Sequence, residues 1–202
     1  MRHAGFPGRS SPVFVAIAAA LLAWPLAGEA QTVSGMARAV QATVLGPLAG
    51  TTTVLADTGP LAGASDALQA SALTGRIPSL FTGETLHATT IGSPDHVASE
   101  ASVADLALSV AGTTIGADFV MARALAVLGR AGAGTSNIAN LSINGVPIPV
   151  SGSANQTIYV PGGLAVINEQ QTSPTSIVVN ALHLIVYGVA DVVIGSAAAG
   201  VQ

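Results

Sequence analysis

The stretch from Ile138 to Gly195 constrains the fold most, because apolar and polar residues alternate in it between strong turn signals. In "IANLSINGVPIPV", Asn144-Gly145 separates two alternating runs, which is the strongest short-range signal for a β-hairpin with a primed two-residue turn. Pro161-Gly162-Gly163 predicts a second hairpin. The β-branched segments "SIVVNALHLIVYG" and "ADVVIGSAA" predict two more strands. This stretch is therefore expected to be the architectural half of an antiparallel sheet protein.

Upstream of this stretch the alternation is clear from Glu100 onward and weaker before it. Leu106, Leu108 and Val110 share one face of a predicted strand. Two segments, 65–73 and 119–128, satisfy a helix as well as a strand, since alanine and leucine favour the helix in both. The sequence leaves these two segments open.

The first thirty residues have the pattern of a secretory signal peptide. Basic residues come first, an apolar run from Val13 to Leu26 follows, and Gly28-Glu29-Ala30 offers the small residues that a signal peptidase reads. The rival interpretation, an uncleaved membrane anchor, is disfavoured because the apolar run is short of the roughly 20 residues a spanning helix needs and Pro25 interrupts it. We expect residues 1–30 to be a signal peptide and residues 31–202 to form one domain without a transmembrane segment. The expected location is secreted, extracellular or at the cell surface, with the periplasm as an alternative.

Charge is scarce, since only 8% of residues are charged, and residues 31–202 carry four arginines against nine carboxylates. This acidic balance argues against nucleic acid as a partner. The chain has neither cysteine nor lysine, which excludes disulfides, thiolate sites and lysine-based covalent chemistry. A surface of uncharged polar residues repels neighbouring copies weakly, so the composition allows a homo-oligomer or a component of a cell-surface matrix.

The core must be built from small aliphatic side chains. Residues 31–202 contain no tryptophan and four aromatic residues, which are Phe81, Phe119, Tyr159 and Tyr187. A core of valine, isoleucine, leucine and alanine suits thin packing of one sheet on another. We therefore predict an all-β fold, a single antiparallel β-sandwich-like domain.

One short pattern recurs. Val103-Ala104-Asp105-Leu106, Ile138-Ala139-Asn140-Leu141 and Val189-Ala190-Asp191-Val192 share the order aliphatic, alanine, Asp or Asn, aliphatic. Their unequal spacing argues against a solenoid. We interpret the pattern as a strand entry in which the Asp or Asn side chain bonds its own backbone.

The polar residues of the last third form the candidate site. Glu169 and Asn180 could supply hard oxygen ligands to a cation or a ligand, whereas the alternative is a half-buried polar ladder that fixes strand register. The register interpretation is favoured, and no catalytic, cofactor-binding or metal-ligating residue is predicted. Tyr159 is the candidate ligand contact, because glycan sites use aromatic platforms. The proposed polar cluster consists of Asn168, Glu169, Gln170, Asn180 and His183.

Three segments carry a resemblance to a known family. "ASVADLALSVAGTTIGADFVMARALA", "ANLSINGVPIPVSGSANQTIYVPGGLAVINEQ" and "VNALHLIVYGVADVVIGSAAAG" resemble, in this order, the bacterial choice-of-anchor P family, over roughly 35–200. The resemblance implies a secreted bacterial surface protein and brings no catalytic residue with it. The expected function is thus a non-enzymatic secreted or cell-surface structural or adhesive β-module that self-associates. The alternative is an extracellular glycan- or ligand-binding module.

Overall fold

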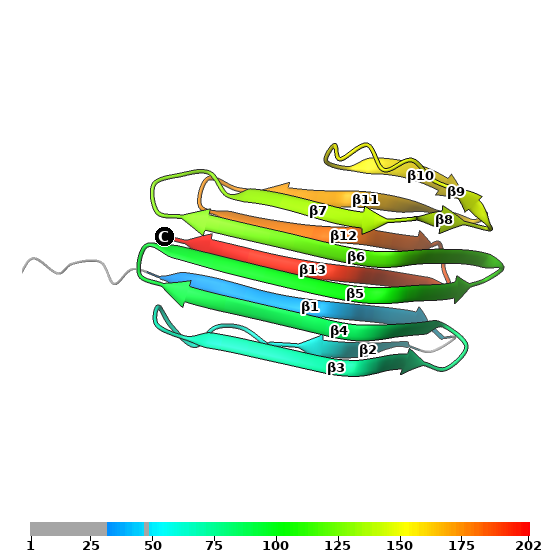
Figure 1. The fold of residues 1–202 in the computed structure, drawn as a ribbon, viewed down its shortest axis with the longest axis horizontal. Coiled ribbons are helices and arrows are strands. Elements are labelled where there is room, and N and C mark those ends of the chain that lie inside the picture. The colour runs from blue at the N-terminus through cyan, green and yellow to red at the C-terminus, as the bar shows by residue number, and fades with distance from the viewer. Residues whose placement is uncertain (1–31, 47–48) are drawn as a thin grey trace, which may run out of the picture. The chain divides into compact units, whose positions relative to one another are not determined.

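Two antiparallel sheets face each other in the chain (Figure 1). The computed structural model describes residues 32–46 and 49–202, so the predicted signal peptide lies outside the described residues. In sheet A the strand order is β10 (Gln156–Val160), β11 (Gly163–Thr172), β12 (Ser176–Val186), β13 (Ala190–Val201), β1 (Val33–Leu45) and β2 (Gly50–Asp57). In sheet B the order is β3 (Ala67–Ile77), β4 (Phe81–Ser93), β5 (His96–Val110), β6 (Thr113–Val127), β8 (Ser142–Ile143) and β9 (Val146–Pro147), with β7 (Ala133–Ala139) also paired to β6. The predicted all-β sandwich-like fold is confirmed.

Both segments left open by the sequence are strands. Residues 67–77 form β3 and residues 113–127 form β6, so the helix alternative is wrong at 65–73 and at 119–128. Each segment is rich in alanine, but each also pairs with neighbours along its whole length, and that pairing outweighs the local helix preference. Within 32–46 and 49–202 no helix is long and apolar enough to cross a membrane.

Both predicted hairpins are present. Asn144 and Gly145 join β8 to β9 with φ of 51° and 75°, as a primed turn requires. Pro161 and Gly162 join β10 to β11, and Gly162 has a φ of 70°. The first hairpin is shorter than its alternating sequence predicts, because Asn140 separates β7 from β8.

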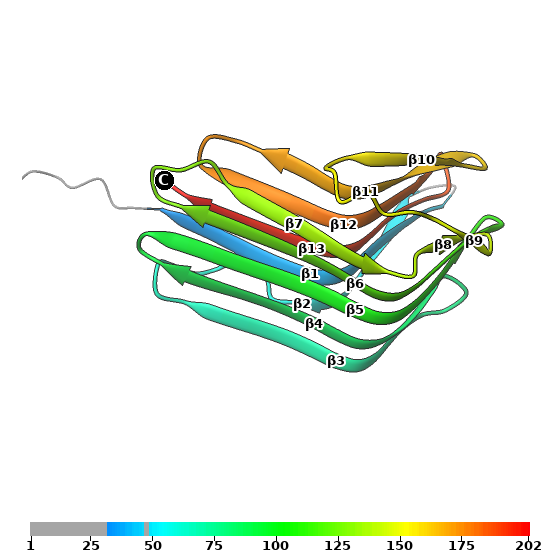
Figure 2. The same cartoon turned by 45° about the horizontal axis from the view of Figure 1, so that its top comes forward.

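The strands of both sheets bend at a shared level (Figures 1 and 2). In sheet A, Asn168, Gly195 and Ala56 lie inside β11, β13 and β2 with φ of 53°, 65° and 47°. The regular pairing skips these residues and the ones opposite them, Ala181 and Ala39. A left-handed residue inside a strand interrupts the ladder and redirects the strand, as a bulge does.

Sheet B bends by the same means. Thr85 in β4, Asp105 in β5 and Asn140 after β7 have φ between 47° and 54°, and the β4–β5 register shifts beside them. Sheet A lies on the inner side of the bend (Figure 2). Accordingly, outward-facing residues of sheet A such as His183 and Val193 are half-buried, whereas outward-facing Ala107 and Ser109 of sheet B are exposed.

The bend corrects the interpretation of the recurring Ala-Asp/Asn pattern. Asp105 and Asn140 are left-handed residues at the bend of sheet B rather than strand entries. Asp191 begins β13 without a positive φ, and its carboxylate contacts His183. Only the third copy of the pattern therefore stands at the start of a strand, and there the Asp191 side chain bonds the His183 side chain and not its own backbone.

The bend divides the core into two arms, and each arm buries both alanines and larger aliphatic residues. In one arm Ser99 of sheet B donates a hydrogen bond of 2.7 Å to the Ala198 carbonyl of sheet A. Such a contact requires the two backbones to approach closely. The buried alanines of this arm are Ala37, Ala88, Ala101, Ala122, Ala124, Ala126, Ala197 and Ala199. On the other side the large buried residues include Phe81, Leu106, Leu108, Ile115, Leu184 and Val192.

Candidate functional site

Three of the five predicted cluster residues come together on the outer face of sheet A. Glu169 lies directly opposite Asn180 in the β11–β12 register, and the Asn180 Nδ2 donates to Glu169 Oε2 at 2.6 Å. His183 Nδ1 lies 2.9 Å from the same carboxylate oxygen. A fourth residue, Asp191 of β13, lies 3.0 Å from His183 Nε2. The imidazole is therefore held between two carboxylates, and its side chain is 14% exposed.

This arrangement limits what His183 can do chemically. Both contacts are hydrogen bonds only if both ring nitrogens carry a proton or one of the carboxyl groups does. Neither ring nitrogen is left free for an outside partner. The geometry therefore fits a hydrogen-bonded network that fixes the positions of β11, β12 and β13 better than it fits a general base.

Asn168 and Gln170 belong to a separate network. Asn168 is 4% exposed, and its Nδ2 donates to the Gly152 carbonyl at 3.2 Å. The Gln170 Nε2 donates to Asn168 Oδ1 at 2.9 Å and to the Gly134 carbonyl of β7 at 3.1 Å. These bonds connect β11 to the loop before β10 and to sheet B. The single predicted cluster is thus two networks, because residues that are adjacent on a strand point to opposite faces.

The polar cluster also continues across sheet A as one row. In the register of the strands Glu169 lies opposite Asn180, Asn180 opposite Ser196, Ser196 opposite Arg38, and Arg38 opposite Asp57. Arg38 pairs with Asp57 at 3.0 Å and also contacts Gln41 and Met36. The row lies beside the bend and connects five strands.

Sequence reasoning missed the Arg38, Asp57 and Ser196 half of this row. Arg38 and Asp57 are 145 and 126 residues from His183 in the chain, and no local pattern in the sequence links them. Asp191 could have been singled out from the sequence, because it belongs to the recurring Ala-Asp pattern. The row can be read only once β13 is known to lie between β12 and β1.

The other histidines and acids are dispersed. In the β4–β5 turn His96 contacts Asp95 at 2.8 Å, and this hydrogen bond lowers the pKa of the exposed Asp95 carboxyl from its usual value. Within the described part of the chain, no group of three or more histidine, aspartate or glutamate side chains is arranged to hold a metal ion.

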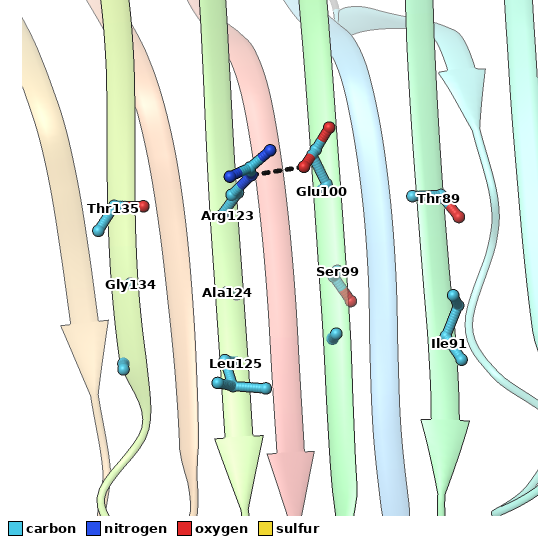
Figure 3. Close-up of a pocket in the computed structure, with 11 residues that line it drawn as sticks. Thr89, Ile91, Ser99, Glu100, Arg123, Ala124, Leu125, Gly134 and Thr135 are labelled. Atoms are coloured by element: carbon cyan, nitrogen blue, oxygen red, sulfur yellow. Dashed lines mark hydrogen bonds and ion pairs between the residues drawn. The ribbon is translucent and has the colours of Figure 1, made fainter.

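A shallow hollow of about 440 Å³ lies on the outer face of sheet B (Figure 3). Two rows that are in register across β4 to β7 line it. One row is polar and contains the ion pair of Arg123 and Glu100, whose Nε–Oε2 distance is 2.5 Å. The other row places Ala98 between the larger side chains Ile91 and Leu125, so the small alanine leaves the depression.

Tyr159 does not belong to either the polar row or the hollow. It lies on β10, the outermost strand of sheet A, opposite Leu164, and it is 84% exposed. Such an exposed ring is available to a ligand or to another protein. Comparison of the chain with protein-family models, with curated proteins and with solved structures finds no match.

Proposed function

We propose that the protein is an exported, non-enzymatic structural or adhesive module of the choice-of-anchor P type, which works at the cell surface or in an extracellular matrix and self-associates. The observation that carries this proposal is a pair of sheets with unpaired edge strands in a chain of which only 8% of the residues are charged. An unpaired strand presents backbone donors and acceptors to any second strand that can reach them. Few like charges are present to oppose the approach of another copy.

The polar residues support a structural role more than a catalytic one. Glu169, Asn180, His183 and Asp191 bond one another, and their contacts connect three strands of sheet A. A general base needs a nitrogen or oxygen free to accept a proton from a substrate. His183 offers none in this arrangement, so its contribution is to hold the strands in register.

Light scattering of the purified protein across concentration and salt tests the self-association. The weight-average mass is expected to rise with concentration. It should change little between low and high ionic strength, because backbone and apolar contacts are not screened as surface charges are. A strict monomer at every concentration would contradict the proposal.

The second candidate is a glycan- or ligand-binding module, favoured by the exposed ring of Tyr159 and by the hollow over Ala98. Aromatic faces and shallow apolar depressions are surfaces that sugars and small amphiphiles use. A glycan array with the unmodified protein and with Tyr159→Ala separates the two candidates. Binding that is lost in Tyr159→Ala would favour recognition, whereas no binding by either protein favours the structural module.

A further inference from the structure

Strand β3 is the longest edge strand of either sheet and carries few of the features that protect sheet edges. Its eleven residues include no proline, no residue with positive φ, and a single charged side chain, Arg76. Natural edge strands are usually shortened, charged, bulged or covered to prevent pairing with other chains. β3 pairs with β4 on one side only. Its other side is therefore a template for a further strand.

The other edges are shorter or partly occupied. β2 has eight residues and β10 has five, while β9 has two residues and ends in Pro147. In β7 the Gly134 carbonyl already accepts a hydrogen bond from Gln170. Among the described strands, β3 thus offers the longest unprotected edge.

The side chains of β3 also lack a neighbour. Leu73 is 86% exposed, which is the largest exposed fraction among the large apolar residues of the described chain. Leu68, Ala70 and Ala72 are only half-buried. A strand added beyond β3 would remove these apolar side chains from water.

The bend restricts the register in which such a strand can be added. In the β3–β4 register the regular pairing skips Leu73, which lies opposite the left-handed Thr85. Leu73 therefore marks the bend in β3. Because every strand of sheet B bends in the same row, an added strand fits only if its own bend falls beside Leu73.

We propose that two copies of the protein associate through their β3 strands, antiparallel and about a two-fold axis that passes beside Leu73, so that sheet B continues from one copy into the other. The inference rests on the proposed self-association and specifies its contact. Leu73 and Thr74 are both exposed, and the buried and half-buried positions resume on either side of them. Directly opposite residues of an antiparallel pair point to the same face, so bend matches bend only when Leu73 lies opposite Thr74 of the second copy. This isologous arrangement closes on itself and leaves no further β3 edge free.

The register has favourable consequences along the strand. Residues 70–77 of each copy pair with residues 77–70 of the other, because the pairing is symmetric about the point between residues 73 and 74. Arg76 then lies opposite Ser71 of the second copy, so the two arginines do not face each other. The two leucines lie beside the axis on the outer face of the sheet, where each reduces the exposure of the other.

Disulfide trapping tests the contact cleanly, because the chain has no cysteine. In the full-length Leu73→Cys protein the two cysteines lie on the same face, one residue out of register across the axis. Their Cα atoms are then about 6 Å apart, within the roughly 4.4–6.8 Å that a disulfide spans. In Ser71→Cys, on the same strand, the two cysteines would lie about 18 Å apart. Tyr159→Cys places an equally exposed cysteine on β10 and measures random collision.

Under mild oxidation, Leu73→Cys is expected to form covalent dimers at least about tenfold faster than Ser71→Cys or Tyr159→Cys, since paired cysteines have a millimolar effective concentration. A Leu73→Glu variant should keep its circular dichroism spectrum and dimerise about tenfold or more weakly, because two carboxylates would lie beside each other on the same face. Equal crosslinking of all three cysteine variants would overturn the β3 contact. If light scattering still shows dimers in that case, only this contact is wrong; a monomer at all concentrations would overturn the proposed function as well.

Discussion

At the residue scale, the His183 side chain connects three neighbouring strands of sheet A. It contacts Glu169 of β11 and Asp191 of β13 from its place in β12. We expect His183→Ala to lower the free energy of unfolding by about 1–3 kcal/mol, because two partly buried carboxylates lose a hydrogen-bond partner. His96→Ala is the matched control, since His96 contacts only the exposed Asp95 in a turn. Chemical denaturation measures both, and equal losses in the two variants would contradict the role of His183.

The left-handed residues mark the limit of sequence reasoning at this scale. Asn144 and Gly145 are recognisable from the sequence because their turn has a known residue preference. Ala56 and Thr85 have positive φ although neither residue type favours it. Their conformation is imposed by the neighbouring strands, which bend in the same row, so no local signal could have revealed it.

At the scale of the element, strand β5 contains a buried, tightly packed alanine and an exposed one. Ala101 is fully buried in the arm where the sheets approach closely, whereas Ala107 faces outward on the same strand. Ala101→Leu is expected to cost about 1–3 kcal/mol through overpacking. Ala107→Leu should stay within about 0.5 kcal/mol of the unmodified protein. Thermal or denaturant unfolding compares the two, and a tolerated leucine at 101 would show that the arm is loosely packed.

Strand β13 holds sheet A together. It pairs with β12 on one side and with β1 on the other, so it joins the C-terminal strands to the N-terminal ones. We expect deletion of residues 191–202 to abolish cooperative unfolding, because β1 and β2 would lose their connection to the rest of the sheet. Circular dichroism during heating measures this. An unchanged melting transition in the truncated protein would show that β13 is dispensable.

The strands were the predictable elements. The alternation and turn signals of residues 138–195 predict β10 to β13, since each of these strands is recognisable from its own local sequence. The order of the strands was not predictable, because the position of β13 between β12 and β1 depends on contacts across more than 140 residues. For the same reason the sequence located Glu169, Asn180 and His183 but missed Arg38 and Asp57 in the same row.

At the scale of the whole molecule, this bent two-sheet sandwich has few charged residues, and its unpaired strand edges present backbone hydrogen-bond donors and acceptors to other molecules. The row of Glu169, Asn180, Ser196, Arg38 and Asp57 holds sheet A together from within, whereas the edge at β3 remains open. The polar residues thus connect the strands of sheet A, and the unpaired edge of β3 is the surface through which we propose that the protein associates with itself.

Hydrogen–deuterium exchange of the purified protein at low and at high concentration tests the proposed association through β3. Backbone amides that become hydrogen-bonded to a second copy exchange more slowly. Protection is expected to rise with concentration in the peptides that cover residues 67–77 and to stay constant in β7 and β10. Exchange that is independent of concentration throughout the chain, or protection that rises at β7 or β10 but not in β3, would contradict this association.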